Sequence, residues 1–408
     1  MPSSLRYGYS SAMDFRLPED SLLLDRRGPQ GEPLDDPAAA VAAALANPIE
    51  FPPLAKAITT DDRVALALSP GVPQAEAVVA GVIYALTEAG IAPEQITIVQ
   101  SASEAKLEGR DLRAGLPLQM RQQVQLATHD PTERTGLAYL AASEQGEAVY
   151  FHRDIGDADL VIPIVCLRGE DVLGEYGPQA GLYPTFADES AQQRFHALSS
   201  HEVSQHREQR AKEADEANWL LGVMLCVGVL PAAGDGVLEV LVGERAKVAE
   251  LGRQLCGQAW AFDIPQRAEL VIATIEGGPE QQTWENVGCA LHAASQAVEH
   301  GGAIVICCDL AEGPGPSVQR LAADGTSDET MRDIRRDQFA DTLTASQLGR
   351  LNENYRLYLR SRLNEDVVES LGMGHVACDE DLLRLASRHR NYIVLGNAQF
   401  AMPRSDDA

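Results

Sequence analysis

Positive charge is the feature that this sequence has least of. Its 408 residues include 33 Lys and Arg against 60 Asp and Glu, which gives a formal net charge of −27. Such an acidic surface repels phosphate backbones, so we expect a soluble protein that does not bind nucleic acid. Self-repulsion of this kind keeps a protein in solution and says nothing about its activity.

Long apolar runs and targeting signals are also missing. The most apolar stretch, Trp219–Leu230, is too short for a membrane helix, which needs about 20 residues. We read it as a core strand. The first residues, "MPSSLRYGYSSAMDF", lack a basic start followed by an apolar segment. We therefore expect a cytoplasmic protein with no membrane partner.

The seven cysteines form no CxxC pair, and the sequence has no GxGxxG dinucleotide fingerprint. Their scatter over expected strands and helices predicts reduced thiols in the core. Cys307 and Cys308 end an apolar run. Alternation along a strand predicts that these two side chains point to opposite faces.

What the sequence does contain is a repeated alternation of strands and helices. Asp36 and Pro37 are suited to cap and begin a first helix. The apolar run 63–69, the helical pattern 75–90 and the run 95–101 then form a β-α-β unit, which predicts parallel strands with a right-handed crossover. The run 159–166 is apolar throughout, as in a strand buried on both faces.

A second set of strands and helices begins near residue 268. The sequence therefore predicts an α/β fold of two Rossmann-like domains, residues 1–262 and 263–408, with largely parallel sheets around an interdomain cleft. Such a cleft is the usual place for a small-molecule ligand. The oligomeric state does not follow from the sequence.

Several segments, taken in their order and spacing, resemble the nickel-pincer lactate racemases (the LarA family) over nearly the whole chain. They include "THDPTERTGLAYLAASEQGEAVYFHRDIGDADLVI", "AELVIATIEGGP" and "ALHAASQAVEHGGAIVICCDLAEGPG". The resemblance implies two α/β domains around a cleft. It also implies a nickel pincer nucleotide tethered to a lysine, nickel bound by a histidine, and two histidines that act as opposing bases on a 2-hydroxy acid.

Most of the positions that the resemblance makes functional are substituted here. In the first domain, the positions of the phosphate and substrate loop, the first catalytic histidine and the tethering lysine fall on Ala67, Ser69, Pro70, Ala105 and Ala180. The second catalytic histidine falls on Glu170, and the second-domain tyrosine and lysine fall on Trp284 and Gly288. The nickel histidine alone is kept, as His196.

The positions of the lysines exclude the expected tether whatever the exact alignment. The chain has four lysines, Lys56, Lys106, Lys212 and Lys247, and none lies near the loop that contains Ala180. The expected tether is therefore missing. We expect no bound cofactor, and the replacement of basic residues by Pro70, Ala180 and Gly288 disfavours an anionic cofactor and an anionic substrate together.

The candidate site residues are few. Glu170 and Asp171 follow the strand 159–166 and are the candidate acid/base pair, or else solvated loop carboxylates. Ser69, Trp284, Gly277 and Gly278 are the candidate cofactor- or ligand-binding positions, since glycines before a helix suit an anion. Core packing is the other reading of Trp284.

The histidines give a weaker signal. His196, His201 and His206 are five residues apart, so they do not share one helix face, and His196 is the candidate metal ligand or a residual histidine. His129–Asp130 before Pro131 reads more simply as turn chemistry.

Two main functions stay open. The first is a lactate-racemase-like protein that has lost nickel-pincer binding and racemase activity and binds a small molecule or a partner. The second is an active isomerase, a racemase or epimerase of a 2-hydroxy acid or related substrate, with altered acid/base residues. Retained nickel chemistry with an attachment other than lysine is a third.

Overall fold

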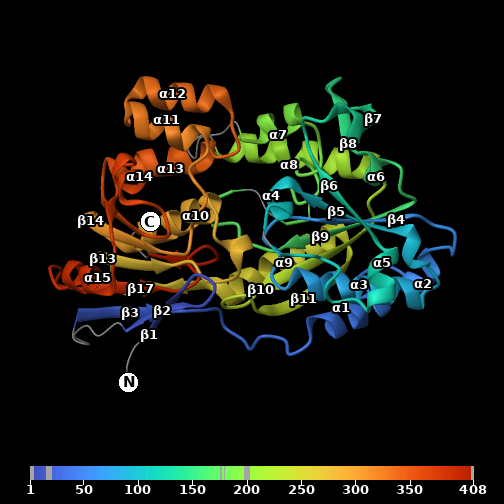
Figure 1. Cartoon of the computed structure of the whole chain (residues 1–408), viewed down its shortest axis with the longest axis horizontal. Helices are drawn as coiled ribbons and strands as arrows, with labels where there is room; N and C mark the ends of the chain where they lie inside the picture. The colour runs from blue at the N-terminus through green and yellow to red at the C-terminus, as the bar shows by residue number, and fades with distance from the viewer. Residues whose placement is uncertain are drawn as a thin grey trace.

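The computed structural model describes residues 4–14, 21–107, 109–174, 177–178, 180–196 and 203–405. Within these residues, two six-stranded sheets with helices on both faces form the frame of the molecule (Figure 1). The architecture is therefore α/β with largely parallel sheets, as the sequence predicts. No helix in the described part is long and apolar enough to cross a bilayer.

The first sheet has the strand order β11-β10-β9-β4-β5-β6. Its pairs are parallel except for β10 with β11. β4 and β10 are buried along their whole length because helices cover both faces, which explains their uninterrupted apolar sequences. The strands are β4 (Val64–Leu68), β5 (Ile96–Ser101), β6 (Gln125–His129), β9 (Leu160–Cys166), β10 (Leu225–Pro231) and β11 (Val237–Glu244).

The second sheet has the order β16-β15-β14-β13-β17-β3, with every pair parallel. Its strands are β3 (Leu22–Arg26), β13 (Ala268–Thr274), β14 (Val298–Cys307), β15 (Arg356–Arg360), β16 (Gly374–His375) and β17 (Tyr392–Leu395). A boundary between residues 262 and 263 separates the strands of the two sheets except for β3. The division into domains 1–262 and 263–408 stays a prediction.

Helices from separate parts of the chain cover each sheet. One face of the first sheet packs on α1 (Pro37–Ala46), α3 (Ala75–Glu88) and α9 (Arg245–Trp260). The other face packs on α6 (Arg153–Gly156), α7 (Glu189–His196) and α8 (Val203–Leu220). The β-hairpin of β7 (Leu137–Ala142) and β8 (Ala148–His152) lies beside them, and the shorter helices are α2 (Leu54–Ala57), α4 (Ala102–Ala105) and α5 (Leu118–Gln123).

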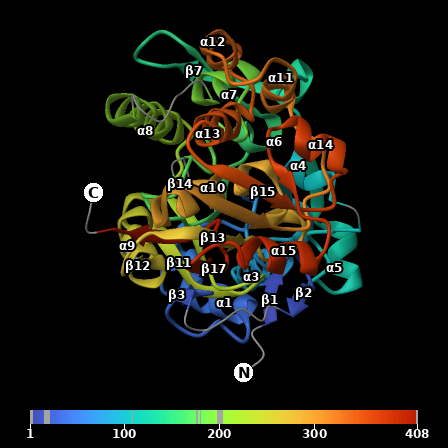
Figure 2. The same cartoon turned by 90° about the vertical axis from the view of Figure 1, so that its left-hand side faces the viewer.

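The second sheet is covered in the same way. α10 (Trp284–Ala297), α13 (Thr342–Asn352) and α14 (Glu365–Ser370) lie on one face, with α11 (Pro316–Asp324) and α12 (Asp328–Asp337) stacked beyond them. α15 (Asp379–Ala386) and the hairpin of β1 (Ser4–Tyr7) and β2 (Ser11–Asp14) lie on the other (Figure 2). The start of the chain therefore packs on the second sheet.

A small third pairing joins the two halves of the sequence. β12 (Ala261–Asp263) runs parallel to β18 (Met402–Arg404), so the described C-terminal segment returns to the point where the second half begins. Two isolated bridges, Gly8 with Glu276 and Ile49 with Gly243, add further long-range contacts.

Several local predictions are confirmed. Asp36 Oδ1 accepts a hydrogen bond from Ala39 N at 3.0 Å, and Pro37 is the first residue of α1. Cys307 and Cys308 are buried in different core clusters, on opposite faces of the second sheet. All seven cysteines are free thiols, and six of them are buried.

One local prediction was wrong. The apolar run Trp219–Leu230 is not a single strand, because its first two residues end α8 and β10 begins at Leu225. Gly222 has a φ of +76°, a conformation that closes a helix and turns the chain. Trp219 and Met224 are consequently exposed.

Candidate functional site

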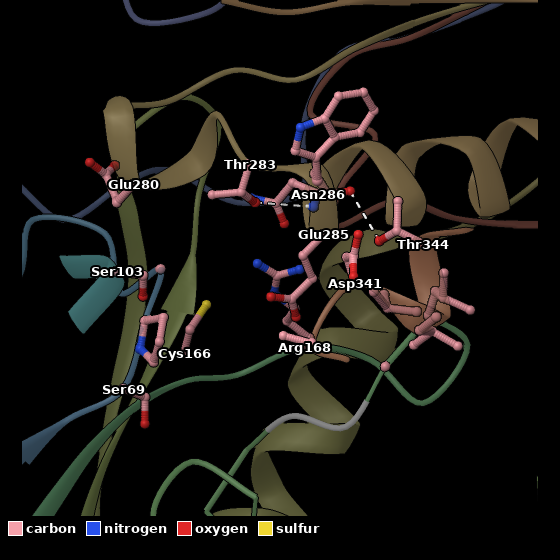
Figure 3. A pocket seen from close by; sticks show the side chains of 18 of the residues that line it. Ser69, Ser103, Cys166, Arg168, Glu280, Thr283, Glu285, Asn286, Asp341 and Thr344 are labelled. Carbon is pink, nitrogen blue, oxygen red and sulfur yellow. Dashed lines mark hydrogen bonds between the residues drawn. The ribbon is translucent and has the colours of Figure 1, made fainter. Parts of the chain in front are cut away.

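A large pocket of about 1790 Å³ lies between the two sheets. Its walls come from the loops that follow the carboxyl ends of β4, β5 and β9 in the first sheet and of β13 and β14 in the second. This is the edge where open α/β sheets bind ligands, because the loops there come from neighbouring strands. Figure 3 shows a selection of the side chains that line it.

Glu170 and Asp171, the predicted acid/base pair, lie at the rim of this pocket. The Glu170 carboxylate is 2.9 Å from Arg253 Nη1, and that of Asp171 is 3.8 Å from Arg404 Nη2. Both carboxylate side chains are about two-thirds exposed, at 66% and 64%. Water screens such exposed ion pairs, so neither contact holds its carboxylate firmly in place.

The four predicted ligand-binding positions separate into two groups. Ser69 and Trp284 line the pocket. The Ser69 hydroxyl is already used, because Oγ donates to Gly181 O at 2.7 Å. Trp284 is part of a core cluster, and its Nε1 donates to Glu312 O at 3.0 Å. Gly277 and Gly278 are outside its described lining. Gly278 precedes a single three-residue 3₁₀ turn, Pro279–Gln281, which offers no extended helix end for an anion.

The predicted metal ligand is His196. His196 ends α7, and its side chain lies outside the described residues, as do those of His201 and His206. Among the side chains that the structure describes, no group of three or more His, Cys, Asp or Glu is arranged to hold a metal ion. His196 as a metal ligand stays a prediction.

His129 and Asp130 are explained by turn chemistry. Asp130 Oδ1 accepts hydrogen bonds from Thr132 N at 2.9 Å and Thr132 Oγ1 at 2.6 Å. The buried His129 ring lies 2.9 Å from Ala187 O through Nε2. Burial lowers the pKa of His129 to about 4, so the ring is neutral near pH 7.

The sequence analysis did not predict a cluster of charged residues at the inner wall of the pocket. Glu104 lies in α4, where Ser101 caps the helix by accepting from Glu104 N at 3.3 Å. Glu104 Oε2 is 2.6 Å from Arg110 Nη1, and Glu280 Oε2 from the second half of the chain is 3.7 Å from the same nitrogen. Both Glu104 and Glu280 line the pocket.

Desolvation dominates the electrostatics of this cluster. Burial raises the pKa of Glu104, against the opposing effects of Arg110 and of the hydrogen bond from Gly71 N. Burial also raises the pKa of Glu280 to about 7, and it raises the pKa of Asp235. Buried carboxyl groups with shifted pKa values in a cleft are candidates for function, although structural clusters show them too.

The sequence analysis also did not single out the basic side chains at the pocket, among them Arg168 and Lys106. Arg168, two residues after β9, has its guanidinium carbon 5.0 Å from the centre of the Phe400 ring, and Nη1 is 3.6 Å from Cys289 Sγ. In Figure 3 it points into the middle of the pocket, beside Glu285. The exposed Lys106 lies on the opposite wall with α4. Arg168 could have been found from its place directly after a buried strand.

Pro70, Ala180 and Gly288 stand where the resemblance implies basic residues. Pro70 and Ala180 line the pocket without contributing charge. Gly288 is buried in α10, where an added Cβ would lie 2.9 Å from Thr344 Oγ1 and 3.5 Å from Leu173 Cδ2. Neighbouring side chains therefore fill the space that a longer residue at position 288 would enter.

This fold and pocket define a two-sheet α/β protein with a ligand-sized cleft between its sheets. Residues 7–208 match the lactate racemase N-terminal domain, and the chain belongs to the lactate-racemase-like family. None of the proteins with curated descriptions matches the sequence significantly.

Two solved structures show the same fold over most of the chain. The lactate racemase apoprotein from Thermoanaerobacterium thermosaccharolyticum has a TM-score of 0.77 at 16% identity, covering 98% of this chain and 99% of that one. A Thermotoga maritima protein from a structural genomics consortium has a TM-score of 0.66 at 12% identity, covering 92% and 99%. At these identities the likeness concerns the fold.

Proposed function

We propose that this chain is a lactate-racemase-like protein that has lost nickel-pincer binding and racemase activity and holds a small molecule in its pocket. The observation that carries the proposal is Ala180. It lies in the wall of the pocket where the resemblance places the tethering lysine, and its methyl group cannot form a covalent bond to a cofactor.

The charge of the pocket supports the same conclusion. Among the described residues, the acidic side chains that line the pocket are Glu104, Glu170, Asp171, Glu280, Glu285, Asp309, Glu312 and Asp341, and the basic ones are Lys106, Arg168, Arg210, Arg362 and Arg404. A phosphate-bearing nucleotide and a carboxylate substrate would therefore enter an acidic site. Bringing anions into such a partly dry site is costly without matching positive groups.

Packing at Gly288 supports it independently. A lysine there would have to displace Thr344, whose Oγ1 donates to Trp284 O at 3.2 Å, or Leu173. Two positions, one on each half of the chain, therefore lack the lysines that the resemblance implies, which supports the loss of the nickel-pincer nucleotide. We derive no chemical step through that cofactor.

A second candidate function is an enzyme of the same family that acts on a different substrate. The buried Glu280, with a pKa raised to about 7, favours it because such a carboxyl group can exchange a proton near neutral pH. In this alternative Glu170 and Asp171 stay candidate acid/base residues at the rim, and the product would be a racemised or epimerised 2-hydroxy acid or a related compound.

The test is a direct assay of configuration. The chain is co-expressed with a nickel-pincer biosynthesis system, purified, and incubated with each enantiomer of lactate and of several larger 2-hydroxy acids. Chiral chromatography then measures interconversion, with the Thermoanaerobacterium lactate racemase prepared identically as a control. We expect no interconversion by this chain. Inversion above the uncatalysed background would overturn the proposal in favour of the second candidate.

A further inference from the structure

Glu104 and Glu280 on the inner wall of the pocket belong to a cluster in which carboxylates outnumber the positive groups. Arg110 is the guanidinium at the centre of the cluster, with Nη1 2.6 Å from Glu104 Oε2 and Nε 2.8 Å from Glu76 Oε1. Glu280 lies further off, at 3.7 Å, and Asp235 is close enough to raise the pKa of Glu280. Three carboxylates therefore contact one guanidinium, and a fourth, Asp235, lies near enough to interact with it electrostatically.

Glu280 has an oxygen that these contacts leave unsatisfied. Its side chain is 7% exposed, and among the described residues Oε1 has no hydrogen-bond partner. Glu104, by contrast, accepts from Gly71 N at 3.0 Å and from Arg110. A buried carboxylate oxygen without a donor is unfavourable, so this oxygen requires a donor or a proton.

The geometry around Glu280 is fixed from both halves of the chain. The next residue, Gln281, is buried and donates from Nε2 to Gly71 O at 2.9 Å. Asn286 Nδ2 donates to Gln281 Oε1 at 3.1 Å. The loop that bears Glu280 is therefore held against the Gly71 loop, whose N–H in turn orients Glu104. Such support is what a binding site needs to keep its shape.

We propose that the Glu104–Glu280 pair is the binding point for a protonated amine, so that the small molecule of this pocket carries an ammonium group. The inference rests on the proposed function and names the class of ligand for it. An ammonium group supplies N–H donors and a positive charge together, and it meets the carboxylates in a site with little water, where such hydrogen bonds are strong.

Without a ligand, a proton supplies the missing donor. The raised pKa of Glu280, about 7, means that near neutral pH this carboxyl group is partly protonated. When the ammonium group binds, Glu280 releases that proton to the solvent and the ammonium N–H replaces it. Binding therefore strengthens with pH until Glu280 is fully ionised.

The test uses three probes with the same three-carbon chain: n-propylammonium, 1-propanol and propionate. Their dissociation constants are measured at constant ionic strength by ligand-observed NMR titration on the full chain. An alkylammonium stays charged to about pH 10, so the pH dependence reports the protein. We expect n-propylammonium to bind more tightly than 1-propanol, propionate to bind least, and the ammonium affinity to fall as the pH drops below 7.

Two variants make the test specific. Glu280→Gln keeps the shape and removes the charge, and it should weaken n-propylammonium binding by about tenfold or more. Glu88→Gln, at the exposed end of α3 away from the pocket, should leave the dissociation constant unchanged. Equal binding of the ammonium and the alcohol, or an unchanged constant in Glu280→Gln, would overturn the inference.

These outcomes are separate from the test of lost racemase activity. An inactive chain that fails to bind n-propylammonium would retain the proposed function and reduce the pair to a proton-bearing contact between the two halves. An active racemase would fail the proposed function whatever the probes show.

Discussion

At the scale of single residues, buried titratable groups set how this molecule responds to pH. Glu280 has a folded-state pKa of about 7, above the ordinary 4.5, so the folded state holds a proton that the unfolded state releases. Its ionisation therefore lowers stability as the pH rises from about 4.5 to 7 and leaves a penalty above that range.

Glu280→Gln removes this penalty. We expect the variant to be more stable than the original chain at pH 8 by on the order of 1–2 kcal/mol, and nearly equal at pH 5, where the carboxyl group is mostly neutral. Urea denaturation at the two pH values measures the difference. A variant that is less stable at pH 8 would show that Arg110 fully compensates the Glu280 charge.

The shifted pKa of His129 changes stability with pH in the opposite direction. Its pKa is lowered to about 4 from 6.5, so the unfolded state binds a proton that the folded state refuses, and the stabilisation present above pH 6.5 is lost as the pH falls toward 4. We expect His129→Gln to weaken this acid sensitivity by about 1–3 kcal/mol between pH 7 and 4.5. Parallel denaturation curves for both proteins over that range would contradict the assignment.

At the scale of elements, helix packing depends on a few close approaches. Gly81 in α3 faces α1, where an added Cβ would lie 2.5 Å from Ala38 O and 2.9 Å from Val41 Cβ. Because one contact is with backbone, the helices would have to separate. We expect Gly81→Ala to lower the free energy of unfolding by about 1–3 kcal/mol.

Gly257 in α9 is the matched control, since an added Cβ there meets nothing within 4 Å. We expect Gly257→Ala to be neutral or to stabilise by about 0.5–1 kcal/mol through helix propensity. Urea denaturation of both variants measures the contrast. Equal effects of the two substitutions would contradict the account of α1–α3 packing.

The elements themselves were largely predictable because their signals are local. The capping residues Asp36 and Pro37 and the uninterrupted apolar runs of β4 and β9 each specify an element within a few residues. The run from Trp219 was misread because apolar character alone does not mark a helix end. The conformation of Gly222 does, and a lone glycine in an apolar run is an ambiguous signal.

At the scale of the whole molecule, the sequence predicts where the pocket lies but not which charged residues line it. Alternating strands and helices predict two sheets and a cleft at their carboxyl ends. Glu104 and Glu280 are 176 residues apart, and nothing in either local sequence indicates that Arg110 brings them together. The sequence instead favours Glu170 and Asp171, because they directly follow a buried strand, and the structure places them at the exposed rim.

Metal content shows most simply whether this family member still holds the nickel-pincer nucleotide, which we propose it has lost. The chain is co-expressed with a pincer biosynthesis system, washed free of loose metal, and analysed for nickel together with its ultraviolet-visible spectrum. We expect negligible nickel per chain and no cofactor band. Near one nickel per chain with a band that disappears in His196→Ala would contradict it and establish an attachment that does not use lysine at position 180.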